Sequence, residues 1–189
     1  MSSARRAAVC AALLIAVPAA IPTELPLPAA PTPASAAPGG MASVEPPAVP
    51  QTGPPGKALL VRGRAIPPVD APPAVKRAIR AANRIRAKPY LWGGGHREWE
   101  ANGYDCSGAV SYALHGGGLL DTPLASGPLM RWERPGRGRW ISVYAHGGHA
   151  YAVIAGLRWD TSGTGGAGPR WQLDTAARSG FVVRHPAGY

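Results

Sequence analysis

Three residues in the C-terminal half of the chain have side chains that could together perform nucleophilic catalysis: Cys106, His149 and Asp160. A thiolate is a strong nucleophile, and an imidazole can accept the thiol proton and later donate it to a leaving amine. A carboxylate can orient the imidazole through its second ring nitrogen. If the fold brings these residues together, they predict attack of a thiolate on an amide.

The local sequence predicts that Cys106 is the first residue of a helix. Asp105 is a good N-cap residue, apolar residues recur at helical spacing after it, and the glycines at 116–118 can end the helix. The unpaired amides and the dipole at a helix N-terminus favour the thiolate over the thiol. The alternative is that Cys106 is a small buried hydrophobic residue, which is the commoner fate of a single cysteine.

β-Strand patterns follow this helix, and they place the histidine and the carboxylate on neighbouring strands. His149 would begin one strand and Asp160 would lie in the next. Taken singly, His149 and Asp160 each have a common structural explanation. Their order in the chain, after a cysteine on a helix, favours a catalytic site. Strands are expected at 140–145, 149–155, 157–161, 171–173 and 181–184. The fold class is therefore predicted to be α+β, with N-terminal helices and the nucleophile helix packed on an antiparallel sheet.

Composition divides the chain at about residue 70. Most of the 22 prolines precede residue 74, and the stretch 37–69 alternates proline with Ala, Gly and Val, which is typical of a disordered linker. The segment 70–189 is long enough for one folded domain. Asp70 is expected to cap a helix that has Pro72 and Pro73 in its first turn.

The first 36 residues have the pattern of a signal peptide. Two arginines, Arg5 and Arg6, precede an apolar stretch at 7–17 that is too short to span a bilayer. Small residues at 34–36 suit cleavage, and a cut nearer residue 30 is also compatible with the sequence. We therefore expect a secreted protein that is extracellular or associated with the cell wall.

Three stretches carry a resemblance to a known family: 88–94 (KPYLWGG), 104–110 (YDCSGAV) and 148–156 (GHAYAVIAG). They resemble the NlpC-type family of bacterial cell-wall cysteine peptidases, a compact branch of the papain-like fold, over about residues 74–189. The resemblance implies hydrolysis of an amide bond in peptidoglycan stem peptides, commonly between D-glutamate and the following diamino acid. We expect no metal ion and no cofactor.

The resemblance also implies roles for individual residues. Cys106 is the nucleophile and its backbone amide contributes to the oxyanion hole, His149 is the general base, and Tyr90 and Ser107 lie on the substrate or oxyanion side. The third catalytic residue of the family is usually His, Asn or Gln. Asp160 occupies the nearest matching place here, and Thr161 and Gln172 are alternatives. In addition, the family usually has a Pro-Gly-Asp segment before the histidine strand, and this chain has GRGRW at 136–140 instead. This difference bears on the shape of the groove and therefore on which bond is cut.

Three further interpretations belong to other classes of function. A domain of the same fold could bind wall peptides without cleaving them, which the unusual third residue favours. A zinc site formed by Cys106, His146 and His149 lacks a compact second pair of ligands and is disfavoured. The formal net charge of +10 attracts polyanions, and export favours anionic wall polymers over nucleic acid. We expect a monomer whose main partners are peptidoglycan stem peptides.

Overall fold

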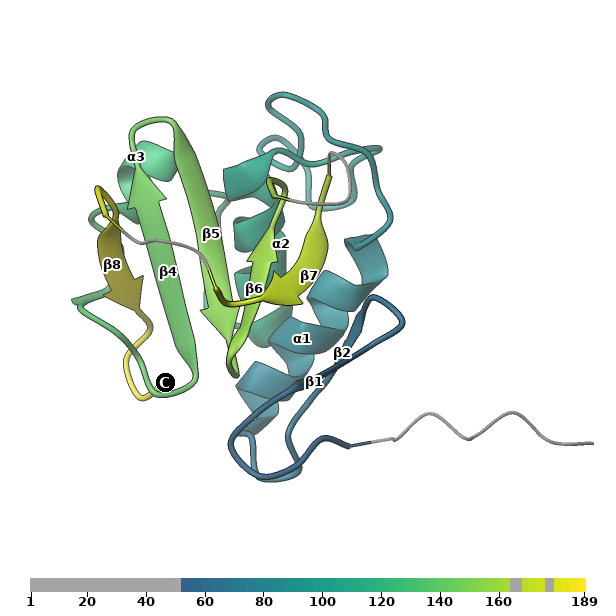
Figure 1. Ribbon diagram of the computed structural model, residues 1–189. Helices are drawn as coiled ribbons and strands as arrows, with labels where there is room; N and C mark the ends of the chain where they lie inside the picture. The colour runs from purple at the N-terminus through teal and green to yellow at the C-terminus, as the bar shows by residue number, and fades with distance from the viewer. Residues whose placement is uncertain (1–51, 164–167, 176–178) are drawn as a thin grey trace, which may run out of the picture. The chain divides into compact units, whose positions relative to one another are not determined.

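The computed structural model describes residues 52–163, 168–175 and 179–189. It confirms the α+β class: helices pack on one face of an antiparallel sheet (Figure 1). The predicted signal peptide and the first part of the predicted linker lie outside the described residues. Within the described part of the chain, no helix combines the length and the apolar character needed to cross a membrane.

The helical layer consists of α1 (Pro73–Ile85), α2 (Cys106–Gly117) and the single turn α3 (Ser126–Leu129). Helices α1 and α2 pack against each other, and a Cβ atom at Gly116 would lie 2.2 Å from the Cβ of Ala81. Glycine at this position therefore permits the close approach of the two helices.

The main sheet has six strands in the order β3-β8-β4-β5-β6-β7, and neighbouring strands are antiparallel. Helix α2 packs on β5 and β6, where the indole Nε1 of Trp159 donates to the carbonyl of Ala109 at 2.9 Å. Arg158 and Asp160 flank Trp159 on β6 and so point to the opposite face. The strands are β3 (Arg134–Pro135), β4 (Ile141–His146), β5 (His149–Ile154), β6 (Leu157–Asp160), β7 (Arg170–Leu173) and β8 (Val182–His185).

Two local expectations differ from the structure. Part of the predicted linker 37–69 forms a hairpin of β1 (Leu59–Val61) and β2 (Arg64–Ile66), so ordered structure begins before Asp70. Asn83 on α1 anchors the hairpin, because its side chain accepts from the amide of Ala65 at 3.0 Å and donates to its carbonyl at 2.8 Å. A composition argument weighted by proline overlooks this short proline-free segment.

The second difference concerns the start of α1. Its N-cap residue is Pro72, without a side-chain capping bond, and Asp70 instead accepts from the amide of Gly56 at 2.8 Å. Pro73 stands at the first helical position, where its fixed φ suits the helix and its missing N–H leaves no donor unpaired. The helix therefore begins without the predicted cap.

Candidate active site

The nucleophile candidate lies where the sequence placed it, at the first residue of α2. Asp105 is the N-cap residue, and its Oδ1 accepts from the amide of Gly108 at 2.7 Å. The amide of Asp105 in turn donates to the carbonyl of Gly94 at 3.2 Å, which fastens the glycine-rich turn to the helix end. A Cβ atom at Gly108 would lie 2.0 Å from that carbonyl oxygen. Only glycine at 108 therefore allows this approach.

The structure brings Cys106, His149 and Asp160 into one hydrogen-bonded chain. His149 is the first residue of β5, and its Nε2 lies 2.9 Å from Oδ1 of Asp160. Its ring is also hydrogen-bonded to the Cys106 thiol. Because Nε2 is engaged by Asp160, Nδ1 is the ring nitrogen that remains to exchange a proton with the thiol. A proton can therefore pass between the thiol and the ring while the carboxylate fixes the ring orientation.

The electrostatics of the pair favour a thiolate and an imidazolium. Burial raises the pKa of Cys106, but hydrogen bonds from His149 and the Ala150 amide, the charge of His149 and a bond to Ser126 outweigh it. The pKa of Cys106 is thus lowered from its ordinary value of 9.0. The pKa of His149 is raised from 6.5 to about 9, first by its hydrogen bond to Asp160 and then by its bond to Cys106.

Asp160 is fully buried, and its carboxylate is held from both sides. Burial raises its pKa, but the hydrogen bond to His149 and the charge of His149, the Ser162 amide and Arg158 outweigh this, so the pKa of Asp160 is lowered. Of the alternatives for the third residue, Thr161 contributes its backbone amide to Asp160, and Gln172 donates to the carbonyl of Ser162. Asp160 is the one of these three candidates whose side chain contacts His149.

A hollow of about 200 Å³ opens beside the Cys106 sulfur. The Ser126 hydroxyl lies 3.8 Å from that sulfur. The hollow is lined by Trp92, His96, Asp105, Cys106, Ser107, Ala125, Ser126, Gly127, Gly147 and Gly148. Cys106 is buried, with 8% of the residue exposed, and it borders this hollow, through which a substrate could reach the thiol.

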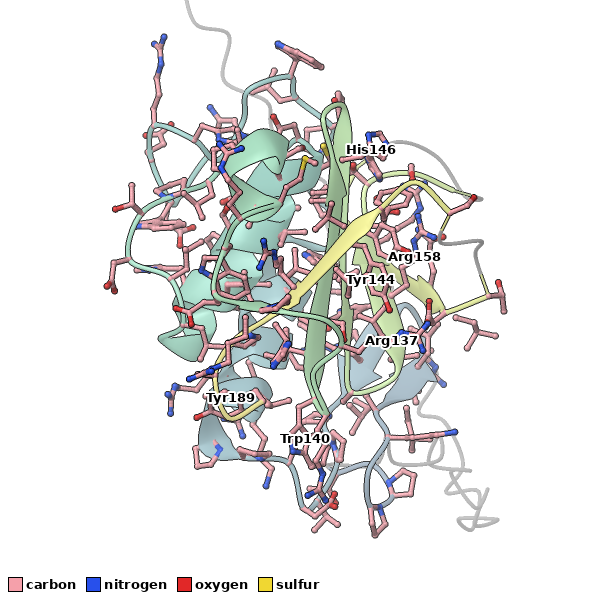
Figure 2. The ribbon with its side chains drawn as sticks, turned by 90° about the vertical axis from the view of Figure 1, so that its left-hand side faces the viewer. Arg137, Trp140, Tyr144, His146, Arg158 and Tyr189 are labelled. Carbon is pink, nitrogen blue, oxygen red and sulfur yellow. The ribbon has the colours of Figure 1, made fainter. Side chains whose placement is uncertain are left out.

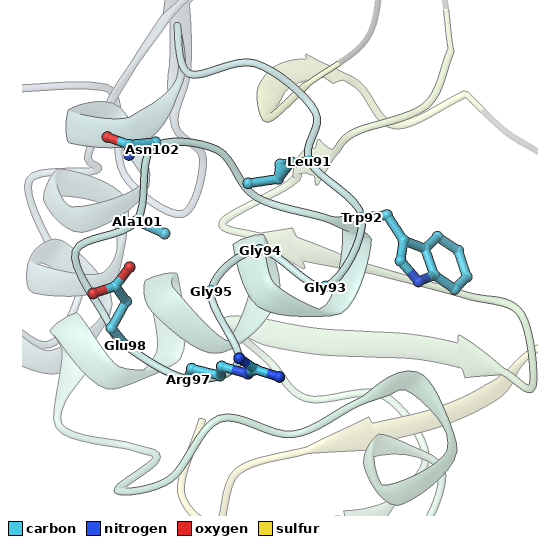
Figure 3. Close-up of a pocket in the computed structure, with 9 residues that line it drawn as sticks. All are labelled: Leu91, Trp92, Gly93, Gly94, Gly95, Arg97, Glu98, Ala101 and Asn102. Atoms are coloured by element: carbon cyan, nitrogen blue, oxygen red, sulfur yellow. The ribbon is translucent and has the colours of Figure 1, made fainter. Parts of the chain in front are cut away.

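A second hollow, of about 280 Å³, is lined by the glycine-rich turn and the segment that follows it (Figure 3). It shares Trp92 with the first hollow, and the Trp92 indole projects from the turn with 85% of the residue exposed. The second hollow is lined by Leu91, Trp92, Gly93, Gly94, Gly95, Arg97, Glu98, Ala101 and Asn102. Trp92 therefore borders both hollows.

The two residues expected on the substrate or oxyanion side lie close to the nucleophile. Ser107 is buried, and its hydroxyl donates to Oδ1 of Asp105 at 3.2 Å. Tyr90 is 38% exposed, and its pKa is raised by partial burial and then by the negative charges of Cys106 and Asp105. Ser107 therefore lines the hollow, whereas Tyr90 lies within electrostatic reach of the sulfur.

His96 is a site residue that the sequence did not indicate. Its Nε2 lies 3.0 Å from each carboxylate oxygen of Asp105 and 3.2 Å from the hydroxyl of Ser107. Its position just after the glycine-rich turn at 93–95 was the only signal, and no periodicity or spacing marked it. His96 thus places a second imidazole on the wall of the hollow.

The other histidine of the β4–β5 hairpin has a structural environment. His146 Nδ1 accepts from the amide of Gly148 at 3.1 Å, and its ring packs on Phe181 with centroids 4.6 Å apart. Among the described residues, no three His, Cys, Asp or Glu side chains are grouped so as to hold a metal ion.

A helix-borne cysteine paired with a strand-borne histidine and a buried acid defines the class of site used by cysteine nucleophiles.

Comparison with models of known families found no match, and no curated protein matches. Among solved structures, the peptidoglycan hydrolase RipB of Mycobacterium tuberculosis is 28% identical with a TM-score of 0.47. That match covers 59% of this chain and 64% of RipB, which is less than two thirds of RipB.

Two other solved structures from the same organism are similar. A hypothetical invasion protein is 25% identical with a TM-score of 0.45, over 60% of this chain and 62% of that one. RipD is described as a non-catalytic NlpC/p60 domain protein adapted to peptidoglycan binding. It is 20% identical with a TM-score of 0.45, over 60% of this chain and 98% of RipD. RipD thus carries the name of the family that the three sequence stretches resemble, while TM-scores below 0.5 assign no family, activity or residue role to this chain.

Proposed function

We propose that this protein is a secreted cysteine endopeptidase that hydrolyses an amide bond in peptidoglycan stem peptides. The observation that supports it most directly is the hydrogen-bonded chain from Cys106 through His149 to Asp160 beside an open hollow. The proposed bond lies between D-glutamate and the diamino acid that follows. The proposed location outside the cytoplasmic membrane rests on the signal-peptide pattern in residues 1–36.

The first half-reaction forms an acyl-enzyme. The Cys106 thiolate attacks the amide carbon, and the oxyanion that develops accepts a hydrogen bond from the Cys106 amide, which has no acceptor within α2 because it belongs to the first turn. The carbon–nitrogen bond then breaks as the imidazolium of His149 gives its proton to the leaving amine. A thioester and a neutral imidazole result.

The second half-reaction returns the enzyme to its starting state. Neutral His149 accepts a proton from water, and the resulting hydroxide attacks the thioester carbon. The carbon–sulfur bond breaks, the acid product leaves and the thiolate faces an imidazolium again. Asp160 keeps one side of the ring engaged in both steps, so that the same nitrogen faces the sulfur throughout.

Cys106→Ala tests the proposal. We expect this variant to release no soluble muropeptides from purified wall and still to bind the insoluble wall, because the change removes the nucleophile from an otherwise intact cleft. The matched control is Thr122→Ala, a change at an exposed residue in the loop after α2, which should leave release unchanged. Cleavage by the Cys106→Ala variant would refute the mechanism. A parent protein that binds wall and does not cleave it would favour the binding-module function.

A further inference from the structure

Arg158 is a buried cation attached to the carboxylate that orients His149. Its Nε donates to Oδ2 of Asp160 at 2.8 Å, and its Nη2 donates to the same oxygen. Its guanidinium carbon also lies 3.8 Å from the centroid of the Tyr151 ring. Tyr151 in turn stacks on Tyr144, with centroids 4.8 Å apart. The guanidinium is therefore held by two ionic hydrogen bonds and an aromatic face.

This arrangement lies on the face of the sheet away from the helices, where Figure 2 shows Arg158 and Tyr144. Arg158 and Asp160 are two residues apart on β6, so their side chains share that face. His149 and Tyr151 are likewise two apart on β5. The pairing is thus built into the alternation of two adjacent strands.

The two oxygens of Asp160 accept from different donor groups. Oδ1 faces Nε2 of His149 at 2.9 Å and accepts from the amides of Thr161 and Ser162 at 2.6 and 3.0 Å. Oδ2 accepts from Arg158 and from the Ser162 hydroxyl at 3.0 Å. Rotation of the carboxylate would break bonds on both sides, so the oxygen offered to His149 is fixed.

We propose that Arg158 is a positioning residue for the proposed reaction: it fixes the orientation of Asp160 and limits how strongly that carboxylate retains the proton on His149. The inference rests on the proposed function. A buried carboxylate shared between two cations stabilises each of them less than it would stabilise one alone. Arg158 therefore keeps His149 charged yet still able to give its proton to the leaving amine.

The other charged and titratable groups around this pair are few in the described residues. The sulfur of Cys106 faces His149 from α2, and the His146 ring on β4 lies with its centroid 6.3 Å from that of His149. Arg170 lies opposite Asp160 on β7, and its guanidinium donates to the carbonyls of Thr161 and Gly168. The guanidinium of Arg158 bonds the Asp160 carboxylate directly.

Arg158→Met tests the proposal, because methionine fills a similar space without charge. We expect the pKa of His149, followed by NMR, to rise by about 0.5–1 unit, and the basic limb of the kcat/KM profile to move upward with it. We also expect kcat to fall about 10-fold with KM unchanged, since a more basic imidazolium protonates the leaving amine less readily. Arg158→Lys should restore the pKa, and Arg184→Met, which removes an arginine that bonds the Met130 carbonyl, should leave it unchanged.

A folded Arg158→Met variant in which the pKa of His149 is unchanged or lower would overturn the proposal. If this variant does not fold, Arg158→Gln retains a donor without the charge and carries the same expectation for the pKa. The NMR titration needs no substrate. An inactive parent protein would therefore refute the proposed function while the pKa comparison still decides the role of Arg158.

Discussion

Asp160→Asn would remove the charge of the third proposed catalytic residue and keep nearly the same side-chain shape. Arg158 can only donate hydrogen bonds, so an asparagine whose oxygen faces Arg158 turns its NH₂ group toward His149 and toward the Thr161 and Ser162 amides, which lose their acceptor. The ring nitrogen Nε2 would then have to accept, which places the ring proton on Nδ1, toward the Cys106 sulfur. An imidazole in that tautomer cannot take the thiol proton.

The expected magnitude follows from the pKa of His149. Its rise from 6.5 to about 9 corresponds to about 2–3 kcal/mol in favour of the imidazolium once solvent screening is allowed for. Asp160 is the largest cause, ahead of Cys106, so Asp160→Asn should lower this pKa more than Cys106→Ala does. We expect kcat to fall by about 10³- to 10⁴-fold, as for the equivalent change in a serine triad.

Two assays measure these effects. NMR titration of the His149 ring gives its pKa in each variant, and the rate of Cys106 alkylation by iodoacetamide at neutral pH reports the thiolate fraction. We expect alkylation to slow about 10-fold in Asp160→Asn, because less imidazolium faces the sulfur. The control is Asp121→Asn, a change at an exposed carboxylate in the loop after α2, which should alter neither quantity.

Two results would contradict this reasoning. One is a pKa of His149 that stays near 9 in Asp160→Asn, since the carboxylate could not then be its main cause. The other is a larger drop in Cys106→Ala than in Asp160→Asn. Circular dichroism of each variant shows whether the fold persists, so that loss of structure is not mistaken for loss of charge.

Two further predictions concern the framework that holds the site. Gly108→Ala should destabilise the fold by more than about 3 kcal/mol in urea unfolding, because the new Cβ would lie 2.0 Å from the carbonyl oxygen of Gly94. Gly127→Ala, where the Cβ meets nothing within 4 Å, is the control, and equal stabilities would contradict the clash. Asn83→Ala should cost about 2–4 kcal/mol, because it leaves buried backbone groups of the β1–β2 hairpin unpaired. The exposed Asn102→Ala should cost almost nothing, and a similar loss in both would argue against the anchor.

Local physical chemistry determined much of this protein from its sequence. A capping aspartate, helical spacing and terminal glycines placed Cys106 at the start of α2, and a hairpin turn followed by a mostly apolar stretch placed His149 at the start of β5. The α+β class followed from the order of these elements. Each of these inferences needs information from only a few neighbouring residues, which is why the sequence was sufficient.

Tertiary structure decided the contacts between distant segments. The choice of Asp160 over Thr161 and Gln172 depends on the register between β5 and β6, which sets the side chain that reaches His149. The His96 contact with Asp105 and the anchoring of the β1–β2 hairpin also required coordinates. These contacts arise from how strands pair and helices pack, and neither propensity nor spacing fixes that geometry, because each contact joins segments whose local sequences are independent of one another.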